Sequence, residues 1–368
     1  MAAIRDSVPL SGTAVRMVHM HGGRVDCSRR EALAALTGLT GLALVAGCGG
    51  GGNAGGGSTI TAATYLPDTY VDLFEPMNLF METATKRSGG QVRFDWYPAE
   101  TLLSAEQLML GLAQDNADLI FTTSSYVSSS YPLLSAMELP FATNSVQHLQ
   151  DVMDAGSELY EMVNDQLASY GLRLLGTLPS AFQAIWTTDR PVRTPEDLRG
   201  LRIRVAGHIE ALTVQAFGAA PTSMSSAEVF EALERGIIDG LMSYPGTIVG
   251  RSLQEVLRYG TLAPFGHYAL AIFVRADWWE QLSEPIRSSL LQASDAYHKA
   301  GTAHLLKVHR EQYFPEIEKG GIEIITLGES EMRPFRAAVE PVHDEWRTSV
   351  GDPEQAEKAL RLVQGLIG

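Results

Sequence analysis

Arg204 is the residue whose position in the chain most clearly indicates binding chemistry. The segment LRIRV at 201–205 alternates apolar and charged residues, which predicts a strand with one buried face. Arg204 lies near the carboxyl end of that strand, where open α/β sheets bind their ligands. A planar guanidinium matches the two oxygens of a carboxylate with two parallel N–H bonds. We therefore expect Arg204 to bind an organic anion; the alternative is a surface arginine on a half-exposed strand.

The residues from 194 to 246 predict a compact unit that would hold Arg204 in place. The strand at 201–205 is followed by a helical pattern at 211–217 and a second one at 229–237. A further apolar stretch at 237–242 is predicted to be the next strand. This alternation of strands and helices is typical of a half-domain with a parallel sheet.

The motifs in this unit resemble those of a known family, in their order and in their spacing. They are DLRG at 197–200, RIRV at 202–205, GAAP at 218–221, EVF at 228–230 and GIIDG at 236–240. As a set they resemble the solute receptors of tripartite ATP-independent periplasmic (TRAP) transporters, the dicarboxylate-type DctP family. Further matching motifs, such as ELPF at 138–141, extend the resemblance from residue 59 to the low 280s.

The resemblance implies an α/β fold of two lobes, similar to the type II periplasmic binding proteins. Hinge strands would cross between the lobes, and a long helix ending near residue 314 would form part of the hinge. The strands predicted at 172–178 and 182–187 would carry the chain into the second lobe, and 256–274 would bring it back. We expect the first lobe at 59–180 and 270–314, and the second lobe at 181–269 and 315–368.

The beginning of the chain has the pattern of an export leader. SRR at 28–30 resembles a twin-arginine signal, and an apolar run at 32–46 follows it. The run is short for a membrane span, which needs about 20 apolar residues. It ends in VAGC, which resembles a lipobox; the alternative is a buried helix. We expect a signal peptide at 1–47, lipid on Cys48, a glycine-rich tether at 48–58, and a protein that is lipid-anchored outside the cell membrane or periplasmic.

Departures from the family pattern affect the expected ligand. Many members carry a second arginine eight residues before the end of the crossing strand, and Gln183 stands at that place here. Ser226 and Ser243 replace an aromatic residue and an amide that are common in the family. The resemblance thus implies a monocarboxylate with a less polar tail, which aromatic residues such as Phe182 would contact. The expected binding residues are Arg204, Gln183, Trp186, Ser243, Tyr244 and Ser226, with Tyr65, Ser124 and Tyr126 from the first lobe.

Motifs of common enzyme classes are absent from the sequence. It contains no GxSxG, no GxxxxGK[ST] and no HExxH. The net charge of −15 argues against a nucleic-acid-binding surface. We expect a receptor without enzymatic activity, metal or cofactor, which delivers a small organic acid to the small and large membrane subunits of a TRAP permease. The alternatives are a receptor of an ABC importer and an extracytoplasmic hydrolase.

Overall fold

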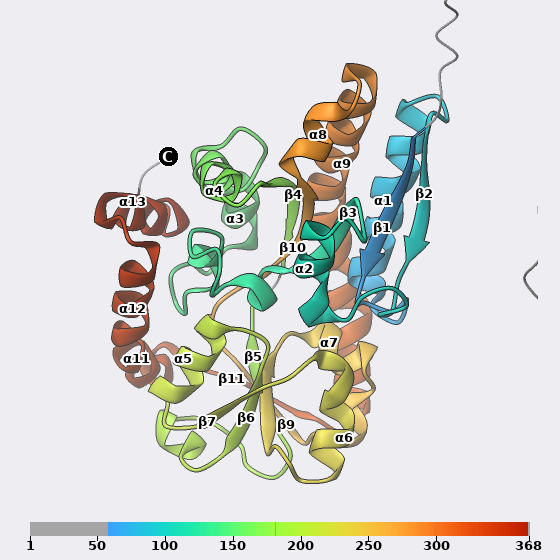
Figure 1. Ribbon diagram of the computed structural model, residues 1–368. Helices are drawn as coiled ribbons and strands as arrows, with labels where there is room; N and C mark the ends of the chain where they lie inside the picture. The colour runs from blue at the N-terminus through green and yellow to red at the C-terminus, as the bar shows by residue number, and fades with distance from the viewer. Residues whose placement is uncertain (1–57, 181, 367–368) are drawn as a thin grey trace, which may run out of the picture. The chain divides into compact units, whose positions relative to one another are not determined.

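The computed structural model describes residues 58–180 and 182–366. The expected signal peptide, Cys48 and all but the last residue of the tether lie outside this part of the chain. The described strands form two sheets, and helices flank both of them (Figure 1). None of the described helices combines the length and the apolar character needed to span a membrane.

The first sheet has five strands in the order β2-β1-β3-β10-β4. β1 pairs in parallel with β2 and β3, whereas β10 runs antiparallel to β3 and β4. β10 has the sequence ALAIFVR and is almost entirely buried, as expected of an inner strand covered on both faces. The strands are β1(Ser58–Thr64), β2(Val92–Tyr97), β3(Leu119–Thr123), β4(Leu172–Pro179) and β10(Ala269–Arg275).

The second sheet has six strands in the order β11-β9-β5-β8-β6-β7. β6, which carries Arg204, lies between β7 and β8 and is parallel to both, so the predicted parallel half-domain is confirmed. β5 is antiparallel to its neighbours β8 and β9. The strands are β5(Ala184–Thr187), β6(Arg202–Val205), β7(Ala220–Ser223), β8(Gly240–Ser243), β9(Tyr259–Leu262) and β11(Glu323–Thr326).

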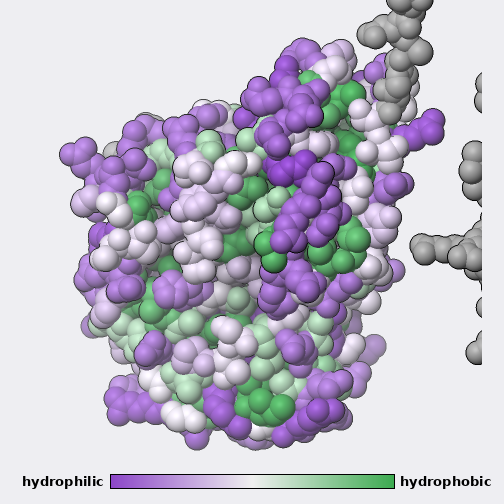
Figure 2. All heavy atoms as spheres, viewed as in Figure 1, coloured by the Kyte–Doolittle hydropathy of each residue, from purple (hydrophilic) through white to green (hydrophobic). Residues whose placement is uncertain are grey.

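The helices bury apolar stripes against the sheets and against one another. In α1(Val71–Arg87) the apolar stripe of Leu73, Met77, Phe80 and Ala84 is fully buried, and α1 packs along α9(Glu284–Val308). On the face shown in Figure 2, charged and polar residues are widespread, with smaller apolar areas between them. The other helices before α9 are α2(Leu108–Ala113), α3(Val146–Val152), α4(Glu158–Ala168), α5(His208–Ala216), α6(Val229–Glu234), α7(Pro245–Gly250) and α8(Ala276–Gln281).

The chain passes between the two sheets three times. β4 and β5 follow each other in sequence but belong to different sheets, and so do β9 and β10. The third passage is α9, which packs on β4 and continues through a π-helical turn, His309–Tyr313, into α10(Phe314–Lys319) beside α7. The predicted two-lobed α/β fold with crossing strands and a long helix is therefore confirmed. The residue boundaries of the two lobes stay a prediction.

Glycines with a positive φ end or separate helices at two places. Residues 145–170 form two helices, α3 and α4, since Gly156 has φ of +86° and Ser157 caps the second helix. The helix predicted at 229–237 ends early, because Gly236 has φ of +63° and turns the chain toward β8.

The described carboxyl-terminal part ends in three helices. They are α11(Glu329–Ala338), α12(Glu340–Val350) and α13(Pro353–Val363). Pro341 lies in the first turn of α12, and Gly351 ends that helix with φ of +77°. Asp352 then accepts hydrogen bonds from the first backbone amides of α13. Pro341, Gly351 and Asp352 are thus the local signals that separate α11, α12 and α13.

Candidate ligand-binding site

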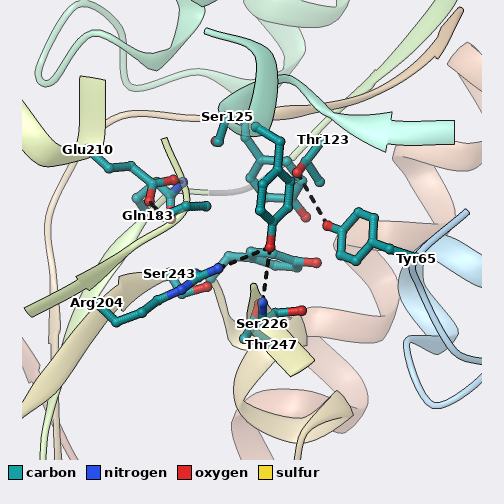
Figure 3. Close-up of a pocket in the computed structure, with 13 residues that line it drawn as sticks. Tyr65, Thr123, Ser125, Gln183, Arg204, Glu210, Ser226, Ser243 and Thr247 are labelled. Carbon is teal, nitrogen blue, oxygen red and sulfur yellow. Dashed lines mark hydrogen bonds between the residues drawn. The ribbon is translucent and has the colours of Figure 1, made fainter. Parts of the chain in front are cut away.

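A small pocket lies between the two sheets, and most of its lining side chains carry a hydroxyl group (Figure 3). The first lobe contributes residues that follow or end its strands: Tyr65, Thr123, Ser125 and Tyr126. The second lobe and the crossing segments contribute Gln183, Arg204, Ala206, Glu210, Ser226, Ser243, Tyr244, Thr247 and Tyr268. The pocket is thus polar and is built by segments far apart in the sequence.

Arg204 is a buried cation in this pocket. Its side chain is only 2% exposed, so the interpretation as a surface arginine is wrong. Nε and Nη2 donate to the carbonyl oxygen of Met224 at 3.0 and 2.8 Å, which fixes the guanidinium plane. Burial opposes the charged form, but Tyr126 and Glu210 outweigh it and the pKa of Arg204 is raised. Among the described residues Arg204 forms no ion pair within 4 Å, so a ligand anion can still pair with its charge.

Tyr126 joins the two lobes beside Arg204. It lies in a short 3-10 helix, Ser124–Val127, and its hydroxyl oxygen accepts from Arg204 Nη2 at 3.1 Å and from Ser226 N at 3.0 Å. The Tyr65 ring meets the Tyr126 ring edge-on at 5.1 Å. Burial raises the pKa of Tyr126, so its phenol stays protonated at neutral pH. The hydroxyl hydrogen of Tyr126 can therefore be donated into the pocket.

Glu210 and Gln183 form a buried polar pair next to this cation. Gln183 Nε2 donates to Glu210 Oε1 at 2.6 Å, and Ala206 N donates to Glu210 Oε2 at 2.6 Å. Burial raises the pKa of Glu210, whereas Arg204 and these donors oppose the shift. The pocket thus combines one arginine with one carboxyl group.

The structure brings seven of the nine expected binding residues together around the pocket. Trp186 does not line it: the indole is fully buried in the core of the second lobe, where Nε1 donates to Ser243 O at 2.9 Å. The physical reason is strand alternation, which places Trp186 and Gln183 on opposite faces. Ser124 also lies outside the lining, since its hydroxyl accepts from Ala269 N at 3.1 Å within the first lobe. The residues in the lining are Arg204, Gln183, Ser243, Tyr244, Ser226, Tyr65 and Tyr126.

Several lining residues are not among the binding residues expected from the sequence. Glu210 lies in the first turn of α5, six positions after Arg204, and Thr247 lies in the first turn of α7 after β8. Both occupy a helix start at the carboxyl end of a strand, a signal that could have identified them. Phe182, expected near an apolar tail, packs against the His267 ring with centroids 4.5 Å apart and is outside the lining.

Comparisons with known proteins agree with this architecture. Residues 65–349 match the family model described as DctP, bacterial extracellular solute-binding protein, family 7. The C4-dicarboxylate-binding protein DctB of Bacillus subtilis (strain 168) is 24% identical over 279 residues, which cover 74% of this chain and 78% of the relative. The sialic acid-binding periplasmic protein SiaP of Vibrio cholerae is 24% identical over 76% of this chain and 86% of the relative.

Solved structures share the fold. DctP7 of Bordetella pertussis, described as an extracytoplasmic solute receptor binding pyroglutamic acid, superimposes with a TM-score of 0.76 at 20% identity, covering 83% of this chain and 99% of that one. A TRAP periplasmic solute-binding protein of Sulfurospirillum deleyianum with bound succinate has a TM-score of 0.75 at 20% identity, covering 83% and 98%. The family model spans most of the chain and the fold agrees with it, so the chain belongs to bacterial extracellular solute-binding protein family 7, the DctP family.

Proposed function

We propose that this protein is the solute receptor of a TRAP transporter and binds a small organic acid through Arg204. The observation that carries the proposal is the buried guanidinium, 2% exposed, without an ion-pair partner among the described residues. A charge removed from water is expensive unless it is paired. A ligand carboxylate would supply the missing partner, and the Tyr126 hydroxyl would donate to the same anion.

The ligand is a monocarboxylate in this proposal. Gln183 lines the pocket where a second arginine is common in the family, so a second carboxylate would have no fixed cation there. It would also lie near the Glu210 carboxyl group. Receptors of this fold have been solved with pyroglutamate and with succinate, so the fold accommodates acids with one or two carboxylates. The hydroxyl-rich lining favours a compact polar acid over one with a long apolar tail.

The receptor would work outside the cell membrane, anchored there by lipid on Cys48 after removal of residues 1–47. It would deliver its ligand to the small and large membrane subunits of the permease, without catalysing a reaction. Family membership supports this role. The three passages between the lobes provide the hinge, since ligand contacts to both lobes would stabilise the closed arrangement.

A thermal-shift panel with an arginine variant tests the proposal. Monocarboxylates such as pyroglutamate and lactate are compared with succinate, malate and fumarate at equal concentration, and the tightest binder gives the largest shift. Arg204→Gln should abolish the shift. Arg202→Gln is the matched control, because Arg202 lies two positions earlier on β6, is exposed and pairs with Asp239. The receptor assignment fails if Arg204→Gln keeps the parent's shifts, and the monocarboxylate assignment fails if dicarboxylates shift most.

A further inference from the structure

Gln183 and Glu210 present hydrogen-bond acceptors to the pocket. Figure 3 shows the two side chains next to each other, with Tyr65 on the opposite side of the view. Both are 3% exposed. Gln183 Nε2 is the end of the amide that donates to Glu210 Oε1, at 2.6 Å. The other end of the amide, Oε1, is buried and has no hydrogen-bond partner among the described residues.

Glu210 adds further acceptor capacity. Its two oxygens accept from Gln183 Nε2 and Ala206 N, and the Ser125 hydroxyl also hydrogen-bonds to this carboxyl group. An ionised carboxylate offers about four lone-pair positions, so these three contacts do not saturate it. A buried acceptor without a donor is unfavourable, and native proteins leave few of them. The side of the pocket formed by Gln183 and Glu210 therefore has acceptors that a ligand donor can bind.

We propose that the ligand is a monocarboxylate that also carries an N–H or O–H donor, which Gln183 Oε1 and Glu210 bind while Arg204 binds the carboxylate. The inference rests on the proposed receptor function and narrows its substrate class. Glu210 acts as a repulsive element as well, since a second ligand carboxylate beside it would meet a like charge. Hydroxy, amino and lactam acids fit this description, whereas simple alkanoates and dicarboxylates do not.

The test uses calorimetry with acids matched in size that differ in the donor. Pyroglutamate is compared with cyclopentanecarboxylate, and lactate with propionate; succinate represents the dicarboxylates. In each pair the acid with a donor should bind at least about tenfold more tightly, because the acid without a donor leaves the buried acceptors unpaired. Glu210→Gln and Gln183→Met should each reduce this ratio and Glu210→Gln should bind succinate more tightly than the parent. Glu231→Gln, an exposed glutamate on α6, is the matched control with an unchanged ratio.

The outcomes separate this inference from the proposed function. Equal affinities within each pair for the parent protein overturn the donor inference and leave the receptor assignment intact. A ratio that survives in both variants also overturns it. The parent's ratio decides alone if a variant fails to fold. If no acid of the panel binds and no organic acid is retained on purification, the proposed function fails, and this inference fails with it.

Discussion

Replacement of Gly207 by alanine should prevent the two lobes from approaching as they do in this structure. Gly207 is the N-cap of α5 and has extended backbone, φ −141° and ψ −179°, which alanine can adopt. A Cβ atom at this position would lie 2.0 Å from the carbonyl oxygen of Ser125 and 2.7 Å from its carbon. Ordinary contacts begin near 3.4 Å, so the short helix that carries Ser125 and Tyr126 must move away from α5 by more than 1 Å.

That movement would weaken the hydrogen bonds that cross between the lobes next to Gly207. They are His208 N to Ser128 Oγ at 3.1 Å, and Tyr126 Oη with Arg204 and Ser226 at 3.1 and 3.0 Å. Each such bond contributes about 0.5–1.5 kcal/mol, so the loss of two costs about 1–3 kcal/mol. Because the proposed site uses groups from both lobes in this arrangement, affinity should fall roughly 5- to 150-fold.

Calorimetry of Gly207→Ala with the ligand that the protein retains measures this loss. Gly328→Ala is the matched control, since Gly328 is also the N-cap of a helix and its Cβ would meet only Glu331 Oε2, at 3.5 Å. Circular dichroism confirms that both variants are folded. If folded Gly207→Ala binds within twofold of the parent's affinity, the contact between Gly207 and Ser125 does not control ligand binding.

Three further changes test other parts of the account. Arg204→Lys keeps the charge but loses the planar fork, so calorimetry should show binding weaker by about 1.5–3 kcal/mol. Glu138→Gln should raise the melting temperature increasingly as pH rises from 4.5 to 8. Burial raises the pKa of Glu138 well above 4.5, although the Ser124 hydroxyl opposes the shift. A raised folded-state pKa gives stability below the unfolded value that is lost as pH rises through the folded value, and glutamine avoids this loss. Cys48→Ser should move the protein from the membrane fraction to the soluble fraction.

Each of these three predictions has an outcome that contradicts it. If Arg204→Lys binds with the parent's affinity, the planar guanidinium of Arg204 is not needed for binding. A constant difference in melting temperature between Glu138→Gln and the parent across the pH range would show that Glu138 does not titrate differently in the folded state. A Cys48→Ser protein that stays in the membrane fraction would exclude lipid on this residue as the anchor.

Arg204 could be identified from sequence because its signal is local and its family context is specific. Alternation along 201–205 places it near the end of a parallel strand, and the surrounding motifs resemble those of the DctP family. Gln183 and Ser226 come from the family resemblance alone, as positions at which a residue common in the family is replaced. The two-lobed fold follows in the same way, since strand and helix periodicity is strong and the order of elements is typical of the family.

Other parts of the site depend on geometry that sequence spacing does not provide. Trp186 lies three positions after Gln183 on an extended segment, so strand alternation turns it into the core. Ser124 opens a 3-10 turn, and there Ser125 and Tyr126 face the pocket while Ser124 faces β10. An acid such as Glu210 in the first turn of a helix is explained equally well by the helix dipole. Only the folded chain places it against Gln183, 27 residues away.

Mass spectrometry of the retained ligand tests whether a ligand carboxylate pairs with Arg204. The parent protein and Arg204→Gln are purified gently, and small molecules released on denaturation are identified and quantified. We expect a small acid with one carboxylate and an N–H or O–H donor, retained by the parent and lost from Arg204→Gln. A ligand without a carboxylate, or one retained equally by both proteins, would show that Arg204 does not hold the ligand through a carboxylate.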